Sequence, residues 1–173
     1  MVVPVSNDLD VPAEVRVRSP WRSAWLAASA VWSVALVVHL LVSAYAWLTY
    51  QGNGPAPDLW SVVLRWNGWD AGHYVRIAES GYDLGPGFPA FFPLYPMLIN
   101  ALDPVLPGGG VVSALVVANA AALGALALLY RLADYEFGPR VAQRAAWYLA
   151  AFPMGFFLFI GYNESLFLLL MVG

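Results

Sequence analysis

The sequence predicts an all-α integral membrane protein whose helices cross the bilayer several times. Only 11% of its 173 residues are charged, whereas a soluble domain carries about 25% charged residues. Hydrophobic residues make up 61% of the chain. They gather in apolar stretches long enough to cross the hydrocarbon core, which takes about 20 residues per helix. We expect three complete transmembrane helices and the start of a fourth.

Composition excludes several classes of function. The formal net charge is −3 and every one of the eight basic residues is Arg, so no basic patch is present for a run of phosphates and we expect no nucleic-acid partner. The chain has no cysteine, which removes disulfides, thiolate zinc sites and thiol nucleophiles. Asp70 and His73 lie one helical turn apart, but two ligands are too few to predict a metal site.

The N-terminal elements are a polar arm and a long apolar helix. Residues 1–22 form the predicted arm, and residues 23–173 belong to one transmembrane domain that begins with a spanning helix over 24–49. Trp21 and Trp47 suit the two membrane interfaces at its ends. A cleaved signal peptide is the alternative, but the apolar region of such a peptide spans only about 7–15 residues.

A long loop over 51–109 carries most of the polar side chains. Within it, the pattern predicts a helix that has Asp70 at its N-cap and ends at Gly81. Prolines punctuate the apolar stretch from Pro86 to Pro107 and prevent a regular spanning helix there. We expect this stretch to rest on the membrane interface or to dip into it.

Two more spanning helices are predicted after the loop. They cover 111–130 and 145–162, with a charged cytoplasmic turn over 131–144 between them and a kink at Pro153. A fourth helix begins within 166–173, and this apolar stretch has too few residues to span a bilayer. We therefore expect the sequence to be the N-terminal part of a longer protein.

The arginines predict the topology in a bacterial plasma membrane. Six of the eight lie before the first helix or around the 131–144 turn, and the other two lie in the long loop. The positive-inside rule then places the N-terminus in the cytoplasm. The 51–109 loop and the Asn163–Ser165 turn face the extracytoplasmic side together.

The long loop holds the side chains best suited to chemistry. Asp70 is either a helix cap or a general base that accepts a proton from a hydroxyl group. The surrounding aromatic residues fit either a sugar site or an interfacial belt. Glu164 lies on the same predicted side. It either lines the same cavity or is a negative charge that the dipole at a helix N-terminus stabilises. His39, alone in the first helix, is predicted to be packed and hydrogen-bonded.

Several motifs resemble one known family. The segments RWNGWDAGHY at 65–74, IA at 77–78, GY at 81–82 and FFPLYP at 91–96 are similar to the first-loop signature of PIG-V-type mannosyltransferases. That family includes the second mannosyltransferase of GPI-anchor synthesis and bacterial relatives. Phe152-Pro153 and the YNESLF segment at 162–167 resemble a later stretch of the family, in the same order.

The resemblance implies a GT-C-like helical bundle that takes mannose from a polyprenyl-phosphate carrier. Transfer would invert the anomeric centre and deliver the sugar to an extracytoplasmic glycolipid or glycan, with Asp70 as the general base. The lipid-linked donor, the acceptor and membrane lipids are then the expected partners, and dependence on a divalent metal stays open. We expect the substrates to contact Arg65, Trp69, His73, Tyr74, Arg76 and Glu164. From the residues alone, we expect Arg76 to pair with Glu79 one helical turn away, and contact with a lipid phosphate is the alternative.

Two other functions stay open from the residues alone. One is a non-catalytic membrane scaffold with the outer loop as a docking surface. The other is a transporter subunit in which Asp70, His39 and Glu164 line a path for ions or substrate.

Overall fold

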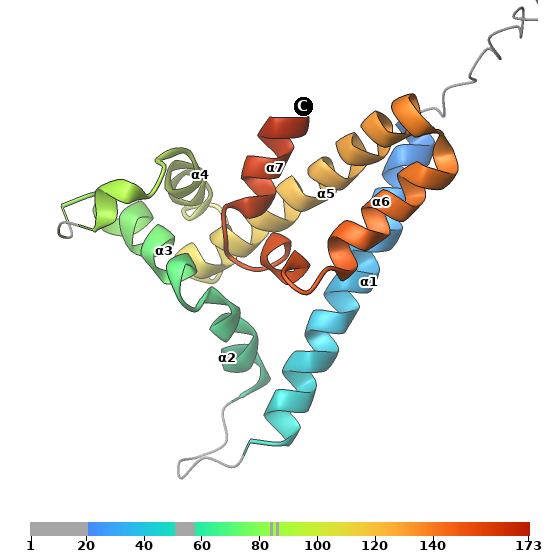
Figure 1. Ribbon diagram of the computed structural model, residues 1–173. Helices are drawn as coiled ribbons and strands as arrows, with labels where there is room; N and C mark the ends of the chain where they lie inside the picture. Colours follow the sequence, from blue (N-terminus) through green and yellow to red (C-terminus); the bar gives the residue numbers. More distant parts are fainter. Residues whose placement is uncertain (1–20, 51–57, 84, 86) are drawn as a thin grey trace, which may run out of the picture.

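The computed structural model describes residues 21–50, 58–83, 85 and 87–173, and every regular element in these ranges is helical (Figure 1). This confirms the all-α prediction. The predicted arm lies outside the described residues except for its last two positions. The described ranges contain seven α-helices: α1 (Trp21–Leu48), α2 (Leu59–Leu64), α3 (Asp70–Ser80), α4 (Leu94–Leu102), α5 (Gly109–Phe137), α6 (Pro139–Ala151) and α7 (Glu164–Val172). Short 3-10 helices lie at η1 (Arg65–Asn67), η2 (Phe88–Ala90) and η3 (Gly155–Leu158).

Two of the described helices, α1 and α5, are long and apolar enough to cross a membrane. Their 28 and 29 residues extend about 42 and 44 Å at 1.5 Å per residue. Large apolar side chains of α1 point away from the rest of the protein, with Leu26 63% and Leu41 64% exposed. Such a surface is expected of a helix that faces lipid. The predicted span 24–49 therefore matches α1 closely.

The helices α1 and α5 run in opposite directions and pack through small residues. Ala24 at the start of α1 is fully buried in a cluster with Tyr130 near the end of α5. At the same end, the Arg131 guanidinium lies 5.2 Å from the centre of the Trp21 ring. Small side chains allow this close approach of two helices. The arrangement leaves α2, α3 and α4 around the other end of the pair (Figure 1).

The predicted turn over 131–144 is wrong in extent. Helix α5 continues to Phe137 and α6 begins at Pro139, so the turn is confined to Gly138, whose φ of 87° suits glycine. An ion pair between Arg131 and Asp134, 3.7 Å long and one helical turn apart, stabilises the charged end of α5. The charges there lie on the helix rather than in a loop.

The third predicted spanning helix, 145–162, is also not continuous. Helix α6 ends at Ala151, and Phe152 adopts an extended conformation with ψ 141°. The cause is Pro153, because a proline disfavours a helical conformation in the residue before it. Gly155 allows the turn that follows, since a Cβ there would collide with the Leu149 carbonyl oxygen.

Asn119 of α5 holds the broken segment in place. Its Nδ2 group donates hydrogen bonds to the Phe159 carbonyl at 2.9 Å and to the Leu115 carbonyl at 2.8 Å. Its Oδ1 atom accepts a bond from Trp32 Nε1 of α1 at 3.2 Å. One side chain thus joins α1, α5 and the segment before α7.

We predict that Asn119→Ala lowers the free energy of unfolding by about 1–3 kcal/mol, because it leaves the Phe159 carbonyl without this donor in a part-buried site. The measurement is equilibrium unfolding of the detergent-solubilised protein. Gln143→Ala, which removes an exposed amide from α6, is the matched control. Equal stability of Asn119→Ala and the control would contradict this role.

After the break, the chain returns along α5. Gly161 lies beside Ala114 of α5, and Leu169 of α7 lies against Gly124 further along the same helix. Helix α7 therefore runs in the same direction as α5. Its first residue lies toward the end of the bundle where α2, α3 and α4 are found. This brings the Asn163–Ser165 turn close to the long loop.

Candidate functional site

The turn between η1 and α3 presents Asp70. Trp69 has φ 51° and ψ −127°, and it is the non-glycine residue with positive φ in the described part of the chain. Such a conformation costs about 1–3 kcal/mol and persists only where the surroundings hold it. It redirects the backbone so that Asp70 becomes the first residue of α3. The Trp69 side chain is left 77% exposed.

Contacts from two distant segments hold this turn. Trp66 Nε1 donates a 2.6 Å hydrogen bond to Ser43 Oγ of α1. The Tyr162 hydroxyl donates a 3.3 Å bond to the Gly68 carbonyl. Ala71, just after the turn, is fully buried in a cluster that includes Tyr162. The strained turn is therefore fixed by tertiary contacts on both sides.

Gly161 makes the approach of the Tyr162 segment possible. A Cβ at this position would lie 3.1 Å from Asn67 Oδ1 and 3.4 Å from the Ala71 Cβ. The Asn67 Oδ1 atom is buried and has no hydrogen-bond partner among the described residues. Two motifs that lie more than 90 residues apart in sequence thus meet at one end of the bundle.

The Asp70 carboxylate is exposed and makes no hydrogen bond or ion pair with the described residues. The predicted N-cap role is wrong, because Trp69 occupies that position and no side-chain bond caps the helix. The carboxylate is not engaged in holding α3 together. It is therefore free to contact a substrate.

Glu164 and Tyr74 share the electrostatic environment of Asp70. Partial burial and, to a smaller extent, the charge of Asp70 raise the pKa of Glu164 above its usual value, against an opposing backbone hydrogen bond. Burial raises the pKa of Tyr74 to about 12, and the charges of Glu164 and Asp70 add to the shift. The structure thus brings together three of the predicted site residues.

The other predicted residues lie on two sides of this group. His73 packs its ring against Phe88 and Phe91, with both centroid distances 5.3 Å. Arg76 stacks on the same Phe88 ring at 5.3 Å, and its expected ion pair with Glu79 is not formed among the described residues.

An apolar groove opens on the side of Arg65. It has a volume of about 230 Å³ and runs between α1 and the η1 turn. Arg65 and Trp69 line it together with the apolar side chains Val42, Ala46 and Val62. A second hollow of about 170 Å³ shares Ser43 and Trp66 with it. The groove therefore combines a cation with an apolar trough.

His39 lines the second hollow and is hydrogen-bonded, as predicted. Its Nδ1 atom lies 2.7 Å from the Ala35 carbonyl oxygen, so Nδ1 carries the proton. Ser43 was missed by the sequence reasoning. The signal that marks it is its position four residues after His39 in the C-terminal half of α1, where the neighbouring side chains are apolar. This spacing places both polar groups on one face.

Acidic, histidine and cysteine side chains do not gather in any group of three that could hold a metal ion within the described ranges. Comparison of the chain with protein families, with characterised proteins and with solved structures gives no match. The likeness to PIG-V-type mannosyltransferases rests on the sequence motifs.

Because burial raises the pKa of Glu164 above 4.5, its ionisation opposes folding. The folded state favours the protonated Glu164 carboxyl. The stability that this preference gives is therefore present in full below about pH 4.5, and it is lost as the pH rises through the raised pKa of the folded state. We expect Glu164→Gln to unfold at a higher temperature than the wild type at pH 7, and at nearly the same temperature at pH 4. Thermal unfolding at both pH values measures this, with Glu79→Gln as the control for loss of one negative charge. A lower midpoint for Glu164→Gln at pH 7 would refute it.

Proposed function

We propose that the chain forms the donor side of a membrane glycosyltransferase. The enzyme moves mannose from a polyprenyl-phosphate carrier to a glycolipid or glycan acceptor outside the plasma membrane. The observation that carries the proposal is the meeting of the Asp70 turn with the Tyr162–Glu164 segment at one end of the helical bundle. These are the two motifs on which the family resemblance rests.

The proposed reaction is an inverting transfer with Asp70 as the base. The acceptor hydroxyl gives its proton to the Asp70 carboxylate while its oxygen attacks the anomeric carbon of the donor. The bond between that carbon and the phosphate oxygen breaks, and its electron pair leaves with the polyprenyl phosphate. A β-linked donor then gives an α-mannoside. The exposed, unpartnered carboxylate supports this role.

Arg65 is the cation best placed to stabilise the departing phosphate. It lines the groove beside Trp69, whose neighbour in sequence is Asp70. A guanidinium binds phosphate oxygens through paired hydrogen bonds, and such fixed charge lowers the barrier where negative charge develops. The apolar trough formed by Val42, Ala46 and Val62 suits the hydrocarbon chain of the carrier. Arg76, in contrast, is stacked on Phe88.

The proposal places this site on the extracytoplasmic side. Arg22 and Arg131 lie toward the same end of the α1–α5 pair, as the Trp21 contact with Arg131 shows. Basic residues favour the cytoplasmic side. The Asp70 turn lies toward the opposite end, where a lipid-linked phosphate reaches the interface.

The test is a transfer assay on the complete native protein in lipid vesicles. Labelled polyprenyl-phosphate-mannose is supplied with an extract of the host membrane lipids as acceptor. We expect label to pass from the carrier to a more polar lipid or glycan, and no label to pass from GDP-mannose. An unchanged carrier pool would overturn the proposal in favour of a scaffold or transport role.

A further inference from the structure

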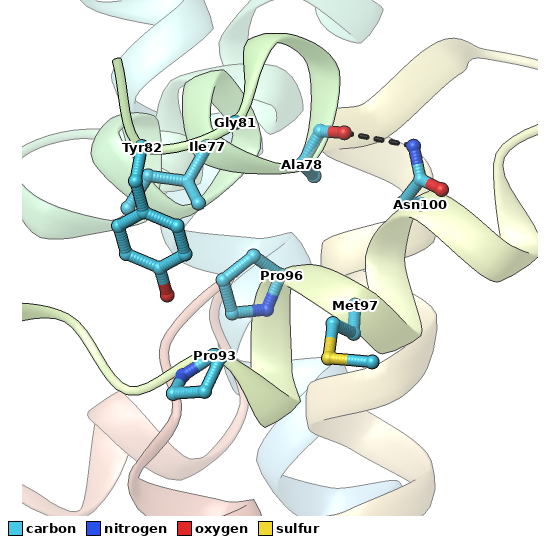
Figure 2. A pocket seen from close by; sticks show the side chains of 8 residues that line it. All are labelled: Ile77, Ala78, Gly81, Tyr82, Pro93, Pro96, Met97 and Asn100. Carbon is cyan, nitrogen blue, oxygen red and sulfur yellow. Dashed lines mark hydrogen bonds between the residues drawn. The ribbon is translucent and has the colours of Figure 1, made fainter. Parts of the chain in front are cut away.

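A separate pocket of about 330 Å³ lies between the C-terminal end of α3 and helix α4 (Figure 2). This volume is within the range of small-molecule sites, about 300–1,000 Å³. None of the residues assigned to transfer lines it. Its walls include Gly81, Tyr82, Pro93, Pro96, Met97 and Asn100.

The hydrogen bonds around the pocket leave acceptors for a ligand. The Tyr82 hydroxyl donates to the Phe91 carbonyl at 2.8 Å, so the Tyr82 oxygen can still accept a bond. Asn100 Nδ2 donates to the Ala78 carbonyl at 2.8 Å, which fixes the amide and leaves its second N–H and its Oδ1 atom for other partners. The Ile77 and Ala78 carbonyls at this end of α3 already accept bonds from the Gly81 N–H and from Asn100, so the acceptors left for a ligand are the Tyr82 oxygen and Asn100 Oδ1, and the negative end of the helix dipole repels anions. The site therefore favours hydroxyl donors and disfavours anions.

The remaining surface of the pocket is apolar and uncharged. Figure 2 shows the Tyr82 and Pro96 rings and the Met97 side chain along it. Every described lining residue is neutral. An aromatic face attracts polarised C–H groups, so the ring suits a ligand with a C–H-rich face and hydroxyl groups at its edge. A neutral pyranose sugar has this chemistry.

The pocket and Asp70 lie at opposite ends of α3. Asp70 is the first residue of α3, whereas the pocket residues Ala78 and Gly81 follow it by 8 and 11 positions, at the opposite end of the helix. The separation along the helix axis is about 12–16 Å. This is further than one pyranose ring reaches.

We propose that this pocket binds a neutral sugar unit of the acceptor, remote from the hydroxyl that reacts at Asp70. The acceptor is then an oligosaccharide rather than a single sugar or a simple lipid headgroup. This inference rests on the proposed function, because it assigns the acceptor of the same site.

The test is saturation-transfer NMR on the complete native protein, with mannotriose as the probe and choline as the comparison. Ala78→Phe fills the pocket from α3, and Met97→Trp blocks it from a side chain that is 65% exposed, where folding is undisturbed. Ser80→Phe, on an exposed position of α3 outside the pocket, is the matched control. We expect the mannotriose signal to fall at least fivefold in both pocket variants and to persist in the control.

An equal mannotriose signal in the wild type and Met97→Trp would overturn the inference. So would a choline signal that Met97→Trp abolishes without a mannotriose signal, because the ligand would then be a cation. A transfer assay distinguishes failure of the pocket inference from failure of the proposed function. Lost pocket binding with active transfer refutes the pocket alone, whereas mannotriose binding in a protein that transfers no sugar refutes the transferase.

Discussion

Asp70→Asn should lower the rate of sugar transfer by about 10²–10⁴-fold, the usual contribution of a general base. Asparagine has nearly the same size but cannot take the proton of the acceptor hydroxyl. The exposed Asp70 carboxylate makes no bond that holds the described part of the fold. The variant should therefore reach the membrane in normal amounts.

The measurement for this variant is the initial transfer rate at saturating donor, normalised to the amount of folded protein. Asp83→Asn, on an exposed position after α3, controls for the loss of a carboxylate in the same loop and should transfer at the wild-type rate. Full activity of Asp70→Asn at an unchanged protein level would remove Asp70 from the reaction.

Gly161→Val should abolish transfer and lower the free energy of unfolding by about 1–3 kcal/mol, the usual effect of overpacking. A Cβ alone would press on Asn67 Oδ1 at 3.1 Å and on the Ala71 Cβ at 3.4 Å. The two methyl groups of valine would separate the segment from the turn that carries Asp70. Gly161→Ala should show a smaller loss in the same direction.

Activity and thermal unfolding of the Gly161 variants are measured side by side. Gly87→Val is the matched control, because a Cβ at Gly87 meets nothing within 4 Å among the described atoms. It should leave both quantities near the wild-type values. A Gly161→Val protein with normal stability and transfer would show that the two motifs need not meet.

Local sequence patterns predict the helices whose ends are set locally. The predicted span 24–49 differs little from α1, and Gly81, with φ 75°, ends α3 as its sequence indicates. The pattern at 131–144 misleads, because the charges that indicate a turn lie on the last turns of α5, where an Arg131–Asp134 pair adds to the stability of the helix. At Pro153 the sequence predicts a kink, whereas the helix ends at Ala151. Both a kink and a break can occur at a proline, so the proline alone does not distinguish them. The segment after the break is held by the hydrogen bond from Asn119 to the Phe159 carbonyl, and this long-range contact has no local signal in the sequence.

The candidate site likewise combines residues that sequence motifs indicate with contacts that only the tertiary fold sets. Asp70 and Glu164 were found through sequence motifs, and their proximity follows from the path of α7 along α5. The conformation of Trp69 has no local signal, because a tryptophan with positive φ is held only by tertiary contacts. The Trp66–Ser43 bond is likewise invisible in sequence, since it joins the loop to a position on α1.

The proposed site depends on the contact between the Asp70 turn and the segment around Gly161, and one cross-link tests this contact most directly. These 173 residues contain no cysteine, so Ala71→Cys/Gly161→Cys introduces the only thiols among them, and any cysteine elsewhere in the complete protein is replaced by serine. Their Cβ atoms would lie 3.4 Å apart, close to the about 3.5–4.5 Å of a disulfide.

The measurement oxidises the complete protein in native membranes, digests it with trypsin under denaturing conditions and compares the fragments with and without reductant. We expect the two fragments to stay joined until reductant is added, and to separate in each single-cysteine variant. The Gly161→Cys single variant is required to unfold at the temperature of Gly161→Ala, which shows that the added side chain does not itself part the two segments. With that control met, separate fragments in the oxidised double variant, even with a short bifunctional thiol reagent, would show that the two segments do not meet.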